Sequence, residues 1–154
     1  MSVFTGYAVS EALRAGGYPG TPDAVAALER DGVTLFVDLT HPSDPLPDYG
    51  PWLHDAHRLA HPIPDMGTPT AGYMMRILDD IDAAQAAGGT AYVHCWGGVG
   101  RTGTVVGCWL MRHGLDDGDP IERIAELRAA IAGDRPSPET PEQTELVRSW
   151  RRGW

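Results

Sequence analysis

The sequence predicts an α/β layer fold with a mainly parallel central sheet. Short apolar runs of strand length alternate with amphipathic segments of helix length along the 154 residues. One of these runs, residues 33–38, is almost continuously apolar, as expected of a parallel strand that is buried on both faces. We therefore expect residues 1–154 to form a single domain.

Glycine, proline and capping residues mark the boundaries of the predicted elements. Thr21 is a favourable helix cap, Pro22 suits the first turn, and Gly32 ends that helix. Four prolines make residues 39–51 a loop. The predicted strands are one or two short edge strands within 3–20, then 33–38, 56–61 and 90–94. The predicted helices are 22–30, 70–87, 104–113, 119–132 and 140–151.

Two of these helices have a clear apolar face. The helix after Thr70 places four apolar side chains at helical spacing. They are Met74, Ile77, Leu78 and Ile81. A second set lies on the helix at 119–132. It consists of Ile121, Ile124, Leu127 and Ile131.

The stretch His94–Gly103 joins a strand to a helix through a glycine-rich turn. The first N–H groups of a helix have no partner within the helix, and the helix dipole is positive at that end. Glycines allow successive N–H groups to converge without side-chain clashes. The stretch therefore predicts a site for a phosphate or another anion.

A cysteine and an arginine occupy the two ends of this predicted cradle. The positive field favours Cys95 as a thiolate, which is a much better nucleophile than a thiol. Arg101 offers a planar fork of donors that can hold two phosphate oxygens. These residues indicate attack on phosphorus and a phosphocysteine intermediate, a chemistry that requires no metal or other cofactor.

The motif resembles the signature loop of the cysteine-based protein phosphatases, His-Cys-x-x-Gly-x-x-Arg-Ser/Thr-Gly, at every position. The resemblance implies a parallel sheet with helices on both faces. It implies that phosphate is bound by the loop residues Trp96, Gly97, Gly98, Val99, Gly100 and Arg101. The spacing Gly98-x-Gly100-x-x-Gly103 also matches a dinucleotide fingerprint, but no second strand follows the helix. A nucleotide-triphosphate loop is excluded because the chain has no lysine.

Asp65 is the predicted general acid. Residues 61–69 resemble the general-acid loop of small dual-specificity phosphatases, particularly the branch of the kinase-associated cyclin-dependent-kinase-inhibitor phosphatases. The alternative is that Asp65 has no catalytic role and is an ordinary solvated residue of a turn. Asp38, at the end of a predicted strand, is the second candidate acid, although capping or support of the site suits it better.

Three further residues are expected to support the reaction. The hydroxyl of Thr102 can donate a hydrogen bond to the Cys95 sulfur and stabilise it as a leaving group. His94 is expected to orient the loop rather than to act as a base. Gln143 lies in a segment that resembles the one in which tyrosine phosphatases keep a glutamine that positions water. The alternative is that Gln143 lies on a solvated face of its helix.

The charge and residue pattern of the chain argue against several classes of partner. The net charge of −9 argues against nucleic acid and anionic membranes. No apolar run is long enough to span a membrane. His54, His57 and His61 have metal-like spacing, but their extended segment would not bring them together, so we predict no metal.

The two cysteines provide no disulfide framework, and Cys108 is expected in the core. A catalytic Cys95 must stay reduced, which favours a cytoplasmic location. We also expect a monomer. The expected substrate is a phosphorylated protein or a small aryl phosphate, with the choice between phosphotyrosine and phosphoserine or phosphothreonine open. Alternatives are a non-catalytic phosphoprotein-binding module, a phosphatase of small phosphometabolites or phosphoinositides, and a reductase or sulfur-transfer enzyme with a similar loop.

Overall fold

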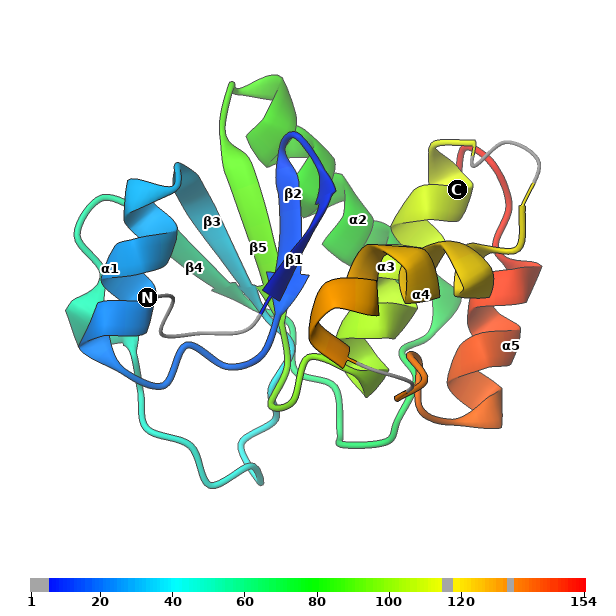
Figure 1. Ribbon diagram of the computed structural model, residues 1–154, viewed down its shortest axis with the longest axis horizontal. Helices are drawn as coiled ribbons and strands as arrows, with labels where there is room; N and C mark the ends of the chain where they lie inside the picture. Colours follow the sequence, from blue (N-terminus) through cyan, green and yellow to red (C-terminus); the bar gives the residue numbers. More distant parts are fainter. Residues whose placement is uncertain (1–5, 115–117, 133–134) are drawn as a thin grey trace.

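A five-stranded sheet forms the centre of the computed structural model, which describes residues 6–114, 118–132 and 135–154 (Figure 1). The strands are β1 (Gly6–Ser10), β2 (Leu13–Gly16), β3 (Val33–Asp38), β4 (His57–Ala60) and β5 (Thr90–His94). The helices are α1 (Pro22–Arg30), α2 (Ala71–Ala86), α3 (Gly100–Arg112), α4 (Pro120–Ala132) and α5 (Pro141–Ser149). Residues 3–5 of the predicted edge-strand segment lie outside the described residues.

The sheet is mainly parallel, as predicted. Its strand order is β1-β2-β5-β3-β4, and β1 is antiparallel to β2 while the other neighbouring pairs are parallel. Helix α1 covers one face and helices α2 to α5 lie on the other (Figure 1). The α/β class with helices on both faces is thereby confirmed.

The predicted caps and apolar faces account for most of the elements. Thr21 and Thr70 each accept a hydrogen bond from a backbone N–H in the first turn of their helix. The four apolar residues of α2 are fully buried. On the apolar side of α4, Ile124 is fully buried and Ile121 and Leu127 pack against the core, whereas Ile131 in the last turn is 43% exposed.

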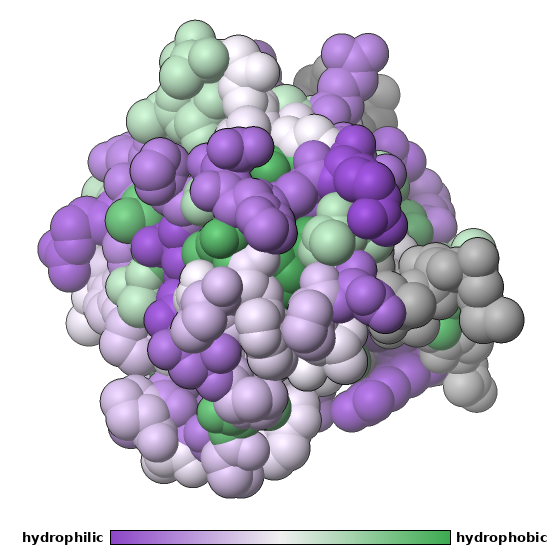
Figure 2. Space-filling model, turned by 90° about the vertical axis from the view of Figure 1, so that its left-hand side faces the viewer, coloured by the Kyte–Doolittle hydropathy of each residue, from purple (hydrophilic) through white to green (hydrophobic). Residues whose placement is uncertain are grey.

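The loops after β3, β4 and β5 meet at one edge of the sheet, the lower edge in Figure 1. Parallel strands end on the same side, and ligands of α/β sheets bind at this edge. The face that Figure 2 presents is mainly polar, with hydrophobic residues in small separate patches. Because the loops converge at the edge of the sheet, we look for the functional site there and not on this face.

Candidate active site

The glycine-rich loop leads directly into α3, which begins at Gly100. Gly98 has a φ of +76°, and a Cβ there would lie 2.5 Å from the carbonyl carbon of Gly16, so only glycine fits. Val99, the N-cap residue, makes no side-chain capping bond, which leaves the first N–H groups of α3 available to an anion. Trp96 and Gly97 are exposed, whereas Gly98, Val99 and Gly100 are buried.

Cys95 lies at the base of this loop with its side chain almost fully buried. The Thr102 hydroxyl donates a hydrogen bond to the Cys95 sulfur over 3.1 Å. A hydrogen bond donated to the sulfur stabilises it as a leaving group. The structure thus brings Cys95 and Thr102 together as the sequence predicts.

His94 supports the loop from below. Burial lowers the pKa of His94 to about 4, so its ring is neutral at pH 7. Its Nδ1 lies 3.3 Å from the Cys95 carbonyl oxygen, and its Nε2 lies 2.7 Å from the Tyr49 hydroxyl. A carbonyl only accepts, so Nδ1–H donates and Nε2 accepts from Tyr49. This arrangement matches an orienting role better than that of a base.

Arg101 is fixed by acceptors from two other loops. Its side chain is 2% exposed, and its Nη1 donates to Asp44 Oδ2 and to the Ile63 carbonyl oxygen, both at 2.8 Å. Its Nη2 lies 3.5 Å from Asp65 Oδ1. The contacts place the guanidinium between the loops that follow β3 and β4 and join the predicted arginine to the predicted acid.

Asp44 is the residue of this site that the sequence reasoning missed. Its side chain is 6% exposed and forms the buried ion pair with Arg101. Burial acts to raise the pKa of Asp44, but the His41 N–H and the Arg101 guanidinium hold that pKa below its ordinary value. Asp44 lies in a proline-rich loop that holds other acidic residues, and no local motif singles it out. The available signal was that this loop follows a buried strand.

Asp65 lies at the open side of the site. Its side chain is 59% exposed, and its Oδ1 also accepts from the N–H of Met66. An exposed carboxyl beside the arginine can reach the leaving oxygen of a bound phosphate ester. Asp38, the second candidate acid, instead accepts from the N–H and hydroxyl of Thr40. These contacts favour Asp65 for the proton transfer.

Gln143 reaches the site from α5. Its Oε1 accepts from the N–H groups of Glu139 and Thr140, and its Nε2 donates to the Gly67 carbonyl oxygen over 3.2 Å. Gln143 is fully buried, so its side chain does not lie on a solvated helix face. It connects the start of α5 to the loop that carries Asp65.

The remaining candidates lie outside this cluster. Cys108 is fully buried, and burial raises the pKa of its thiol. Nε2 of His61 contacts Asp80 at 2.6 Å, and the backbone N–H of His54 donates to Glu29. Within residues 6–114, 118–132 and 135–154, no three His, Cys, Asp or Glu side chains converge as a metal site would require.

Comparison with known proteins shows the family to which the chain belongs. Residues 3–153 match the model described as "Swiss Army Knife protein, DSP-PTPase phosphatase domain". The chain belongs to this family of phosphatase domains. The assignment to the dual-specificity and tyrosine phosphatases made from the loop and the acid segment is confirmed.

Individual relatives agree with the family. An uncharacterized protein of Methanocaldococcus jannaschii is 40% identical over 86 residues, which are 56% of this chain and 54% of that protein. Cyclin-dependent kinase inhibitor 3 of Rattus norvegicus is 35% identical over 68 residues, 44% of this chain and 32% of that protein. The chain thus spans about half or less of the length of these two curated relatives.

A solved structure supports the same fold. The crystal structure of Tk-PTP in the active form is 25% identical, with a TM-score of 0.77 over 94% of this chain and 95% of that one.

None of the described helices is long and apolar enough to span a membrane.

Proposed function

We propose that this protein is a cysteine-dependent phosphomonoester hydrolase that acts on phosphorylated protein. The supporting observation is the cluster at the carboxyl edge of the sheet. Thr102 donates to the Cys95 sulfur over 3.1 Å, and the guanidinium of Arg101 lies 3.5 Å from Asp65. The nucleophile and the acid lie in neighbouring loops, and the phosphate clamp Arg101 lies in the first turn of α3, whose N-terminus has no side-chain cap.

The first step transfers the phosphoryl group to sulfur. The phosphate oxygens bind the loop N–H groups and the Arg101 guanidinium. The Cys95 thiolate attacks phosphorus and forms a sulfur–phosphorus bond while the ester oxygen–phosphorus bond breaks. Asp65 gives its proton to the leaving oxygen, so that an alcohol or phenol departs.

The second step regenerates the enzyme. Water attacks the phosphorus of phosphocysteine, and the Asp65 carboxylate accepts the proton of that water. The sulfur–phosphorus bond breaks and the electron pair returns to Cys95, where the Thr102 hydroxyl stabilises the thiolate. Inorganic phosphate leaves, and Asp65 is protonated for the next cycle. Each step uses residues of this chain alone.

Turnover of an aryl phosphate tests this proposal. We expect the purified protein to hydrolyse nitrophenyl phosphate in the presence of EDTA and to be inhibited by vanadate, which mimics pentavalent phosphorus. The Cys95→Ser variant should lose turnover but still bind phosphate, because the cradle consists of backbone N–H groups and Arg101. Near wild-type turnover by Cys95→Ser would overturn the mechanism, and binding without turnover by wild type would favour a binding module.

Phosphopeptides then define the substrate. We expect hydrolysis of a phosphotyrosine peptide, and a matched phosphoserine or phosphothreonine series would establish whether the specificity is dual. Activity confined to phosphoinositides or to small phosphometabolites would replace phosphorylated protein as the substrate class. Size-exclusion chromatography would test the expected monomer, and cell fractionation the expected cytoplasmic location.

A further inference from the structure

The residues that precede Asp65 are attached to helix α2. His61 follows β4 directly and stands four residues before Asp65. Its Nε2 lies 2.6 Å from Asp80 Oδ2 of α2. A carboxylate only accepts hydrogen bonds, so the ring N–H of His61 donates. The side chain of His61 is 17% exposed, so water competes little for this hydrogen bond.

A second hydrogen bond joins the same segment to the same face of α2. The Tyr73 hydroxyl donates to the Pro62 carbonyl oxygen over 3.0 Å. Tyr73 and Asp80 are seven residues apart, about two helical turns, so they share one face of the helix. The ring of Tyr73 also lies edge-on to the ring of His61, with 5.9 Å between their centroids. Helix α2 therefore holds two consecutive residues of the segment that leads to the acid.

Prolines carry this placement forward to Asp65. Pro62 and Pro64 have a fixed φ, so the chain between His61 and Asp65 has few conformations. The Gly67 N–H donates to the Pro64 carbonyl oxygen over 2.8 Å and closes the turn that contains Asp65. The side chain of Asp65 is 59% exposed, so packing fixes its direction less than the backbone of this segment does.

We infer that His61 and Asp80 are positioning residues for the general acid, an inference that rests on the proposed function. The pair holds the start of the segment against α2, so that the Asp65 carboxyl meets the leaving oxygen of the phosphate ester. A displacement of about 1 Å at a reacting group can lower a rate about 10²-fold. Loss of the pair should therefore impair the proton transfer and leave the attack by Cys95 intact.

The dependence of kcat/KM on the leaving group tests the pair. Asp80→Ala should lower kcat/KM about 10- to 100-fold for phenyl phosphate, whose leaving group needs the proton, and far less for nitrophenyl phosphate. Asp80→Asn keeps an oxygen that accepts from His61 and should retain most of the activity. Equal losses on the two substrates would overturn the inference, because the pair would then not act on proton transfer.

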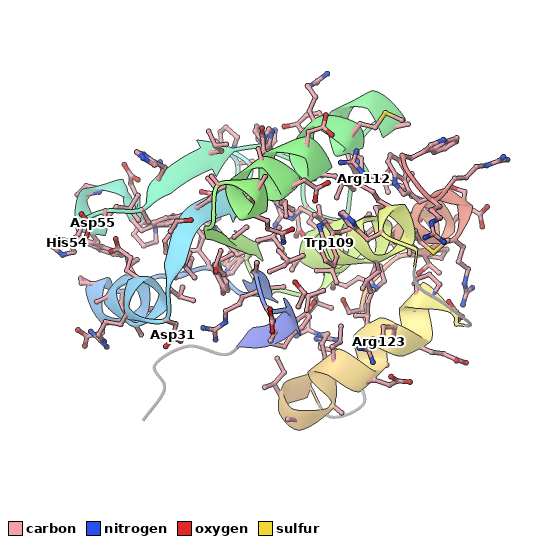
Figure 3. The ribbon with its side chains drawn as sticks, turned by 90° about the horizontal axis from the view of Figure 1, so that it is seen from above. Asp31, His54, Asp55, Trp109, Arg112 and Arg123 are labelled. Carbon is pink, nitrogen blue, oxygen red and sulfur yellow. The ribbon has the colours of Figure 1, made fainter. Side chains whose placement is uncertain are left out.

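Asp79→Ala is the matched control. Asp79 is the adjacent residue of α2, but it pairs with Arg112 of α3 over 2.8 Å rather than with the acid segment (Figure 3). The variant removes the same charge from the same helix, and its ratio of the two kcat/KM values should stay that of wild type. A ratio changed as much as in Asp80→Ala would assign the effect to the charge of α2 and not to the pair.

Combined variants show whether the pair acts through Asp65. His61→Ala should reproduce the effect of Asp80→Ala, and the double variant should lose no more than either, because both changes remove one contact. In an Asp65→Asn background, Asp80→Ala should slow phenyl phosphate no further. A further loss of the same size in that background would place the action of the pair elsewhere. His61→Ala keeps the test available if Asp80→Ala does not fold.

An NMR comparison needs no turnover and separates this inference from the proposed function. The Met66 N–H donates to Asp65 Oδ1 over 3.0 Å, so its ¹⁵N–¹H signal reports where that carboxyl lies. The signal should shift or broaden in Asp80→Ala and stay in place in Asp79→Ala. An unchanged signal in Asp80→Ala would contradict the inference. Absence of turnover in wild type would instead count against the proposed function and not against the placement of Asp65 by the pair.

Discussion

Two buried arginines flank the catalytic loop, and their surroundings have opposite charge. Arg101, 2% exposed, lies toward β3 and β4 between the carboxylates of Asp44 and Asp65. Arg128, 5% exposed, lies toward β1 and β2 beside a phenol and a second arginine. The burial of an arginine therefore does not by itself indicate its role, which depends on the groups that accept its hydrogen bonds.

The acceptors of Arg101 explain how its direction is set. Asp44 and the Ile63 carbonyl hold one nitrogen of the guanidinium, which leaves the remaining donors to a substrate. A clamp whose direction is fixed before binding loses little freedom when the phosphate arrives. Arg128 has no such carboxylate among the described residues; its Nη1 donates to the Arg135 carbonyl oxygen instead.

The largest expected effect comes from changing the shape of each cation while keeping its charge. Arginines that stabilise phosphoryl transfer contribute about 10³–10⁵-fold. Arg101→Lys should therefore lose activity of this order, because an ammonium cannot replace a bidentate fork. Arg128→Lys should leave kcat/KM for nitrophenyl phosphate nearly unchanged. Equal losses in the two variants would erase the functional distinction between the arginines.

Asp65→Asn tests the acid beside Arg101. General acids contribute about 10²–10⁴-fold, and the contribution grows as the leaving group becomes more basic. The variant should slow phenyl phosphate and phosphopeptide far more than nitrophenyl phosphate, and the basic limb of its kcat/KM profile should flatten. The measurement is kcat/KM against leaving-group pKa; equal slopes for wild type and variant would assign the acid elsewhere, with Asp38 next to be tested.

Much of this site could be predicted from sequence because its chemistry depends on local order. The loop from Cys95 to Arg101 is a continuous segment whose glycines, nucleophile and cation have fixed spacing. Asp44 could not be predicted, because its role arises only when a proline-rich loop folds over a segment 57 residues away. The burial of Arg128 also depends on tertiary packing, and no local pattern in the sequence of α4 indicates it.

Asp44→Asn measures the support of Arg101. Removing one partner of a buried ion pair typically destabilises a protein by about 3–5 kcal/mol, and Asp65 near the same guanidinium should keep the loss below that range. The pKa of Asp44 is lowered in the folded protein, so its contribution is full above the unfolded value near 3.9 and disappears as pH falls through the folded value.

Urea unfolding at several pH values provides the measurement. The difference between wild type and Asp44→Asn should be constant between about pH 5 and 7 and should shrink below about pH 4. Asp48→Asn is the control, because Asp48 pairs with Arg58 at an exposed position of the same loop and should matter less. A difference that does not change with pH would contradict a role for the Asp44 charge.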